Sequence, residues 1–264
     1  MTASFLSSVY QFRGLIHSIV VRDLRSRYIG SVLGIAWLIL PPIFMVFIYT
    51  VVFSTIMRAR LPGVESQYAY SVYLCAGIIV WTFMLELVQR GKGVFLENAN
   101  LIKKTSFPRL VLFIPVVVVA LFNALILLAL VMIFMLFAGF GLSTAVASFF
   151  AALAAALYLG LVVGVLASIL NVFFRDTGQI VDVLSQGLFW ATPIVYPVGI
   201  LPERVQVIMH FNPVFSVVRV AQDALLGMPI NFGILMPALV FATVILIAAL
   251  FLYKRSYADL LDQI

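Results

Sequence analysis

Uncharged apolar runs dominate this sequence, and the longest extends from Leu110 to Phe174. It holds 65 consecutive residues without Asp, Glu, Lys or Arg, and Arg109 and Arg175 close its two ends. A single helix of that length would measure about 100 Å, whereas the hydrocarbon core of a bilayer is only about 30 Å thick. The run must therefore fold back on itself, and residues 139–144 (GFGLST) are the best place for the turn. Two membrane-spanning helices are predicted here.

Four further apolar runs predict four more spans. The first is expected at about 32–53 and contains Pro41-Pro42, which remove two backbone donors and kink a helix. The other three are expected at about 68–85, 180–195 and 231–252. The predicted fold class is therefore an all-α integral membrane protein with six transmembrane helices.

Residues 4–28 show the period of an amphipathic helix. Apolar side chains recur at steps of three and four, which places them on one face: Phe5, Val9, Phe12, Ile16, Ile19 and Val20. The opposite face carries Gln11, Ser18, Arg22 and Arg25. This pattern favours a helix lying in the plane of a membrane surface, with its basic groups toward the lipid headgroups. The alternative is a soluble helix packed on a partner.

Residues 196–230 do not fit a plain loop, because they hold four prolines but stay apolar. A short helix is expected near 214–225, with Arg219 and Asp223 paired at i,i+4 on the face opposite its apolar side chains. We interpret the segment as short re-entrant or interfacial helices between spans five and six.

The composition agrees with a membrane protein, since 64% of the 264 residues are hydrophobic and 10% are charged, against about a quarter charged in soluble domains. A net charge of +6 could indicate nucleic acid, but membrane proteins gather Lys and Arg in cytoplasmic loops for topological reasons. The single cysteine, Cys75, excludes an internal disulfide and a cysteine-based metal site. No cofactor and no metal site is expected.

The basic residues also predict an orientation. With six spans both termini share one side, which holds 12 Lys and Arg against 4 on the other. The side with the excess is expected to be cytoplasmic. One domain is expected over 1–264, with an interfacial helix at 1–30, six spans within 31–253 and a cytoplasmic tail at 254–264.

The sequence offers no catalytic constellation. It has no phosphate-binding loop of the G-x-x-x-x-G-K-[ST] type and no dinucleotide fingerprint. An ion-coupled carrier needs ionisable residues near mid-membrane, but Glu86 and Asp182 lie at span ends, and Glu86 has Arg90 one turn on as a structural partner. The chain is therefore not expected to be an enzyme, and it carries no ATPase of its own.

Four segments in order resemble the permeases of ABC-2 type exporters, most closely the branch that exports O-antigen, capsule and teichoic-acid polysaccharides (the Wzm type). They are residues 21–28 (VRDLRSRY) with 31–34 (SVLG) and Trp37; 100–104 (NLIKK) with 107–109 (FPR); 174–176 (FRD); and 192–197 (TPIVYP) with Leu201-Pro202 and Asn212-Pro213. Two departures are Leu110, where an acidic residue often follows FPR, and Thr192, which replaces a common serine.

The resemblance implies a homodimer of six-span permeases in a bacterial inner membrane, each docked on a separate ATP-binding cassette subunit that hydrolyses ATP. The substrate would be a lipid-linked polysaccharide, with O-antigen as the leading class. In this family the N-terminal helix and the loop between spans two and three meet the ATPase. The contacts it implies here are Arg22, Asp23, Arg25, Glu97, Asn100, Lys103, Lys104, Arg109, Arg175 and Asp176.

The resemblance also implies a polysaccharide channel lined by aromatic side chains, whose faces suit the apolar C–H faces of sugars. The candidates are Trp37, Phe44, Tyr49, Phe53, Phe189, Trp190 and Tyr196. The alternative for each of them is lipid-facing or core packing, or a place in an interfacial aromatic belt.

Two other functions stay open. An ABC-2 exporter of a drug or a lipid would be encoded beside a multidrug-type ATPase instead of glycan assembly enzymes. An ion-coupled secondary transporter would show inverted repeats and a mid-membrane charge, and the sequence shows neither.

Overall fold

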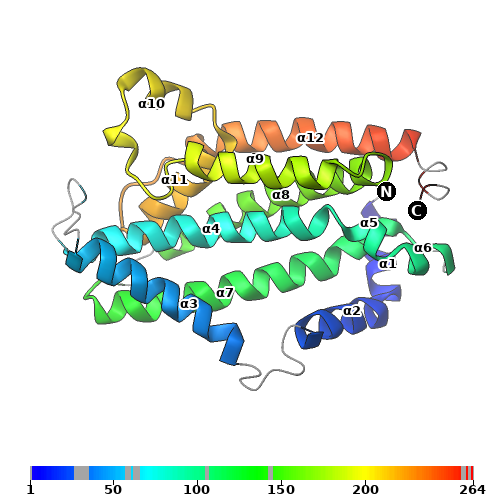
Figure 1. The fold of residues 1–264 in the computed structure, drawn as a ribbon, viewed down its shortest axis with the longest axis horizontal. Helices are drawn as coiled ribbons and strands as arrows, with labels where there is room; N and C mark the ends of the chain where they lie inside the picture. The colour runs from blue at the N-terminus through cyan, green and yellow to red at the C-terminus, as the bar shows by residue number, and fades with distance from the viewer. Residues whose placement is uncertain are drawn as a thin grey trace.

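The computed structural model describes residues 2–26, 36–56, 61, 66–104, 107–141, 145–256, 260 and 263, and within these ranges the chain is helical with no strand (Figure 1). The elements are α1 (Thr2–Gln11), α2 (Arg13–Ser26), α3 (Ala36–Tyr49), π-helix η1 (Thr50–Ile56), α4 (Ala69–Gly91), α5 (Val94–Glu97), α6 (Ala99–Lys104), 3-10 helix η2 (Arg109–Leu112), α7 (Phe113–Phe137), α8 (Ala145–Phe173), α9 (Thr177–Ala191), 3-10 helix η3 (Val198–Ile200), α10 (Glu203–Met209), α11 (Pro213–Leu225), 3-10 helix η4 (Phe232–Leu235) and α12 (Met236–Arg255). The all-α fold class is confirmed.

Four helical stretches are long and apolar enough to cross a membrane: Ala69–Gly91, Arg109–Phe137, Val146–Phe173 and Phe232–Arg255. They differ in how far the protein itself covers them. In the most apolar part of α4, 83% of the residues are buried, against 22% in α12. Helix α4 is therefore the centre of the bundle, packed on α7, α8 and α11, and α12 forms its rim.

The predicted turn between spans three and four is confirmed. Helix α7 ends at Phe137, and Gly139 follows with a φ of +79°, a left-handed conformation that glycine adopts at little cost. Helix α8 begins at Ala145, so the long uncharged run folds into two helices. Residues 142–144 of the predicted turn lie outside the described residues.

Two shorter helices complete the bundle. Residues Ile39–Ser54 form an apolar helix across α3 and η1, with Pro41 and Pro42 inside α3. Helix α9 has only 15 residues and ends in the non-helical segment 192–197. Both are shorter than the roughly 20 residues that a helix needs to cross the hydrocarbon core of a bilayer. Residues 27–28 and 31–34 of the first segment that resembles the ABC-2 permeases, and the start of the predicted first span, lie outside the described residues.

The N-terminal segment differs from the single helix predicted at 4–28. It forms α1 and α2 with a break at Phe12, whose ring lies 5.8 Å from that of Phe107 between ring centroids. Gly14, a weak helix former, follows the break. The two predicted faces of α2 are present, since Ile19 is buried while Arg22 and Arg25 are exposed. Helix α2 packs against α7.

Helix α11 also differs from its prediction. The Arg219–Asp223 pair forms as expected, with Nε of Arg219 2.9 Å from Oδ2 of Asp223. However, Asp223 is only 6% exposed, because α11 packs between α4, α8 and α12 and is buried on nearly every side. The helix is capped by Asn212, whose Oδ1 accepts from the backbone N–H groups of Val214 and Phe215.

The two ends of the bundle carry different elements. Figure 1 shows both termini at the end that also holds α5 and α6, where the connection from α8 to α9 lies as well. The opposite end holds α10 and the turn between α7 and α8. The elements predicted to lie on one side of the membrane therefore meet at one end.

Candidate functional site

A groove with a volume of about 560 Å³ lies between α3, α4 and α9. We call it the aromatic groove. Its walls combine aromatic, aliphatic and polar side chains: Met45, Tyr49, Ile78, Trp81, Thr82, Leu85, Asp182, Ser185, Gln186, Phe189 and Trp190.

The rings of the aromatic groove form a connected series. The ring centroid of Phe189 lies 5.5 Å from that of Trp81 and 5.2 Å from that of Trp190, both within the range of favourable aromatic pairs. Trp190 is 67% exposed, so most of its ring is available to another molecule. The groove thus offers flat apolar faces beside polar groups, a combination that suits a sugar.

The polar groups of the groove are positioned by their own helices. The hydroxyls of Thr82 and Ser185 each donate to a backbone carbonyl one turn back, at 2.7 Å. The Asp182 carboxylate lies 2.5 Å from Nζ of Lys92, which also donates to the carbonyl of Gly178 at 3.1 Å. This pair ties the end of α4 to α9.

Three of the seven predicted channel aromatics line the groove: Tyr49, Phe189 and Trp190. Trp37 and Phe44 are exposed on α3 outside it, at 49% and 62%. Phe53 and Tyr196, the remaining two, lie outside the groove lining.

Phe53 and Tyr196 continue from the groove on η1 and after α9. The ring of Phe53 stacks on that of Tyr70 with centroids 5.3 Å apart, and it also contacts Tyr49 edge-on. The hydroxyl of Tyr196 donates to the carbonyl of Trp190 at 2.9 Å. Both side chains therefore have partners within the chain.

Sequence reasoning missed Trp81 and the polar face of α9. Asp182, Ser185, Gln186 and Phe189 follow one another at steps of three, one and three, which places them on one helical face. That spacing is visible in the sequence and could have predicted a partly polar helix face that lines a groove. Trp81 gave no comparable signal, because it lies in a continuous apolar run.

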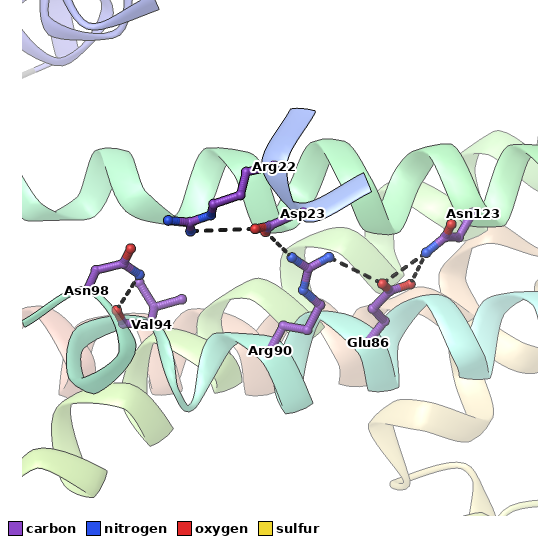
Figure 2. Close-up of polar contacts among 7 residues, drawn as sticks. All are labelled: Arg22, Asp23, Glu86, Arg90, Val94, Asn98 and Asn123. Carbon is purple, nitrogen blue, oxygen red and sulfur yellow. Dashed lines mark hydrogen bonds and ion pairs between the residues drawn. The ribbon is translucent and has the colours of Figure 1, made fainter. Parts of the chain in front are cut away.

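A polar network joins α2, α4 and α7 in the described part of the chain, and Figure 2 shows its members. Nη2 of Arg90 lies 2.5 Å from Oδ2 of Asp23, and Nη1 of Arg90 lies 3.5 Å from Oε1 of Glu86. The amide of Asn123 donates to both oxygens of Glu86 at 2.9 and 2.8 Å. Arg22 lies 3.5 Å from Asp23 at the exposed edge. The predicted Glu86–Arg90 pair is confirmed.

The network is mostly shielded from water. The side chains of Asp23, Glu86 and Arg90 are 21%, 18% and 22% exposed, so their charges depend on each other for compensation. Glu86 and Asn123 also line a pocket of about 230 Å³, together with Pro41 and Pro42 of α3. The network thus borders a pocket that α3 also lines.

Most residues predicted to contact an ATPase lie on the surface at the end of α5 and α6. The exposed ones are Arg22, Arg25, Glu97, Asn100, Lys103, Lys104, Arg175 and Asp176. Asp23 is half-buried in the network, and Arg109 is only 4% exposed. A side chain as buried as Arg109 has little surface to offer a partner, and it follows Phe107, which packs on Phe12.

Residues 192–197 form a non-helical segment whose backbone carbonyls are satisfied by side chains of α4 and α11. The hydroxyl of Tyr73 donates to the carbonyls of Tyr196 and Pro193, at 3.1 and 3.3 Å, and that of Tyr70 donates to Val195 at 2.8 Å. The amide of Gln222 donates to Pro193 and Ile194 at 3.4 Å. Irregular backbone at membrane depth is tolerated only where protein covers it in this way.

Among the described residues, no group of three or more His, Cys, Asp and Glu is placed to hold a metal ion.

Comparison with known proteins identifies the family. The model of the ABC-2 type transporter family matches residues 14–226. The chain is 30% identical over 210 residues to the O-antigen export system permease protein RfbA of Myxococcus xanthus, covering 79% of this chain and 78% of that protein. It is 28% identical over 213 residues to the protein of the same name from Klebsiella pneumoniae, covering 80% of each. It is 22% identical over 253 residues to the polysialic acid transport protein KpsM of Escherichia coli, covering 94% of this chain and 95% of that protein.

Proposed function

Because this chain belongs to the ABC-2 type transporter family, we propose that it is the permease subunit of an exporter that moves lipid-linked polysaccharide across a bacterial inner membrane. The named relatives support this substrate class, since they are permeases of O-antigen export and a transport protein for polysialic acid. The best-supported substrate is O-antigen, because the two O-antigen export permeases share a higher identity with this chain than the polysialic acid transport protein does.

The aromatic groove is the observation that carries the proposal. Its series of rings, Trp81, Phe189 and Trp190, gives a sugar chain several weak stacking surfaces. Asp182 and Gln186 add hydrogen-bonding groups for hydroxyls. A moving polymer needs many weak contacts, because one strong site would trap it. Phe53 and Tyr196 are its proposed continuation beyond Tyr49 and Trp190.

Six membrane crossings fit this function. In addition to the four long stretches, we propose that α3 with η1 forms the first crossing and α9 with the segment 192–197 forms the fifth. Helices α1 and α2 then lie at the membrane surface, and α10 and α11 re-enter from the opposite side. Residues 1–264 form one such domain.

A second copy of the chain is proposed to complete the channel. The groove is open between α3 and α9, and both helices carry exposed apolar side chains, among them Phe44, Phe47 and Val183. Two copies that met along these faces would enclose the grooves and bring Trp37 and Phe44 toward the same path.

The driving force is proposed to come from a separate ATP-binding cassette subunit. Its docking surface is the exposed polar end formed by α2, α5 and α6, where Lys103 and Lys104 are exposed. Arg175 and Asp176 add to the same end. Because Asp23 joins this surface to Arg90 and Glu86, a displacement of α2 reaches α4, α7 and the pocket wall formed by Pro41-Pro42.

The test is reconstitution of the chain with its ATPase subunit in proteoliposomes that contain a lipid-linked glycan. We expect ATP to make the glycan accessible to a lectin on the opposite face of the membrane, and a non-hydrolysable ATP analogue to leave it inaccessible. Transport of a fluorescent drug or phospholipid without transport of any lipid-linked glycan would contradict the proposal and favour an exporter of drugs or lipids.

A further inference from the structure

A second cavity, of about 360 Å³, adjoins the aromatic groove between α4, α8, α9, α12 and the start of α11. We call it the apolar pocket. Trp81, Leu85 and Ser185 line both cavities and form the wall that separates them. On α9, Val181 and Leu188 face the apolar pocket, while Asp182 and Phe189 face the groove.

The chemistry of the apolar pocket is that of a hydrocarbon site. Ser185 is the one hydroxyl-bearing residue among those that line it, and that hydroxyl donates to the carbonyl of Val181 at 2.7 Å. Ordered water needs two to four polar partners, and these walls do not supply them. A group the size of a water molecule occupies about 30 Å³. The pocket therefore accommodates a hydrocarbon chain of roughly a dozen such groups.

The pocket is open toward the side of the bundle. Leu184 of α9 and Phe241 of α12 line it and are 65% and 44% exposed. Helix α12 is the least covered of the four long helices, which places this opening where the protein would meet lipid. A hydrocarbon chain can therefore enter from the bilayer without crossing the groove.

We propose that the apolar pocket binds the hydrocarbon tail of the substrate's lipid anchor while the glycan of the same molecule occupies the aromatic groove. The inference rests on the proposed function. The shared wall supports this occupant, because an amphiphile bound across Trp81, Leu85 and Ser185 satisfies both cavities at once. An ordinary phospholipid has no part that requires the groove.

The test is photolabelling of the complete complex with its ATPase subunit in nanodiscs of phosphatidylethanolamine and phosphatidylglycerol. One probe is a polyprenyl diphosphate-linked disaccharide with a diazirine on the second isoprene unit from the diphosphate, within the length of chain that the pocket accommodates, and the other is phosphatidylglycerol with a diazirine at the end of an acyl chain. We expect the glycolipid probe to label α8 and α9 at the pocket walls at least fivefold more than the phospholipid probe.

Filling the pocket supplies the matched comparison. Val181→Phe on α9 and Val163→Phe on α8 each place a larger side chain in the pocket, from two different walls. Each is expected to lower the labelling by the glycolipid at least fivefold. Val118→Phe, on an exposed residue of α7 that lines neither cavity, is expected to leave it unchanged. Two variants on different helices guard against a failure of one to fold.

Three results would overturn the inference: no label at the pocket walls, equal labelling by the two probes, or labelling that neither Phe variant lowers. Glycan transport is measured on the same complexes. Transport without labelling of the walls would sink the anchor site alone, whereas labelling without transport would sink the proposed function and leave the pocket.

Discussion

The tyrosine hydroxyls of α4 hold the backbone of residues 192–197 in a path that no helix could follow. Pro193 and Pro197 contribute no N–H groups, and the carbonyls of the segment would be costly to bury without donors. Tyr70, Tyr73 and Gln222 supply those donors. The resemblance drew attention to this segment, and the structure gives it a physical basis in these three side chains.

Replacing Tyr73 by Phe is expected to lower the free energy of unfolding by about 1–3 kcal/mol, because it leaves the carbonyl of Tyr196 without its donor and that of Pro193 with Gln222 alone. Tyr158→Phe is the matched control, since its hydroxyl pairs with Thr243 in an exposed position, and a change within about 0.5 kcal/mol is expected. Unfolding in mixed micelles of rising denaturing-detergent content measures both. Equal losses for the two variants would contradict the assignment.

At the scale of elements, α4 and α8 approach so closely that side chains are excluded between them. Gly160 and Gly164, spaced as in a small-xxx-small motif, face Leu87 and Gly91 of α4. A Cβ at Gly164 would lie 2.8 Å from the backbone oxygen of Leu87, closer than side chains tolerate. This contact fixes the central helix of the bundle.

Gly164→Ala is therefore expected to destabilise the fold by about 1–3 kcal/mol through overpacking. In Gly187→Ala on α9 the new methyl group meets open space, so the higher helix propensity of alanine is expected to stabilise by about 0.5–1 kcal/mol. The same micelle titration compares them. A Gly164 variant as stable as the original chain would show that the α4–α8 contact is looser than described.

The ion pair between Asp23 and Arg90 joins α2 to α4, and it has a consequence for transport. Asp23→Asn removes the charge opposite Arg90 and is expected to weaken that link by roughly 1.5–3 kcal/mol. Arg13→Gln is the control, because Arg13 is an exposed residue of α2 that lies outside the network and outside the predicted ATPase contacts.

For Asp23→Asn we expect ATP hydrolysis by the complex to continue while the glycan exported per ATP falls, and for Arg13→Gln no change in that ratio. Parallel measurements of phosphate release and lectin accessibility in proteoliposomes give the ratio. If Asp23→Asn lowered hydrolysis and export in proportion, the network would serve assembly of the complex instead of coupling.

The sequence predicted local features well and long-range ones poorly. Charge-free runs bounded by Arg109 and Arg175 predicted α7, α8 and their turn, and the i,i+4 spacing predicted the pair of Glu86 with Arg90. It did not predict the contact of Asp23 with Arg90, which are 67 residues apart. Membrane helices are apolar toward both protein and lipid, so their sequences do not reveal which face meets which neighbour.

At the scale of the whole molecule, most basic residues lie in segments that the fold brings to one end of the bundle. Figure 1 places both termini with α5 and α6, and residues 1–30, 86–109 and 254–264 carry 11 of the 16 Lys and Arg residues. We propose that this end is cytoplasmic. Helix α10 marks the opposite end.

Cysteine labelling tests the orientation cleanly, because the native Cys75 is fully buried and gives no background. A membrane-impermeant maleimide is expected to label Arg204→Cys in spheroplasts with an intact inner membrane, and Asn98→Cys only after that membrane is permeabilised. Labelling of Asn98→Cys alone in the intact preparation would reverse the orientation.

The central claim is that the aromatic groove carries a polysaccharide, and its lining rings offer the most direct measurement. In proteoliposomes with the ATPase subunit, we predict that replacing Tyr49, Phe189 and Trp190 together by Ala stops the ATP-driven appearance of glycan, with ATP hydrolysis and folded protein retained. The control replaces three exposed aromatic residues outside the groove, Phe122, Phe150 and Phe251, and is predicted to export normally. If the groove rings served only packing, each change would cost about 3–5 kcal/mol and export would fall only with the amount of folded protein. Normal export by the folded groove variant would contradict the account.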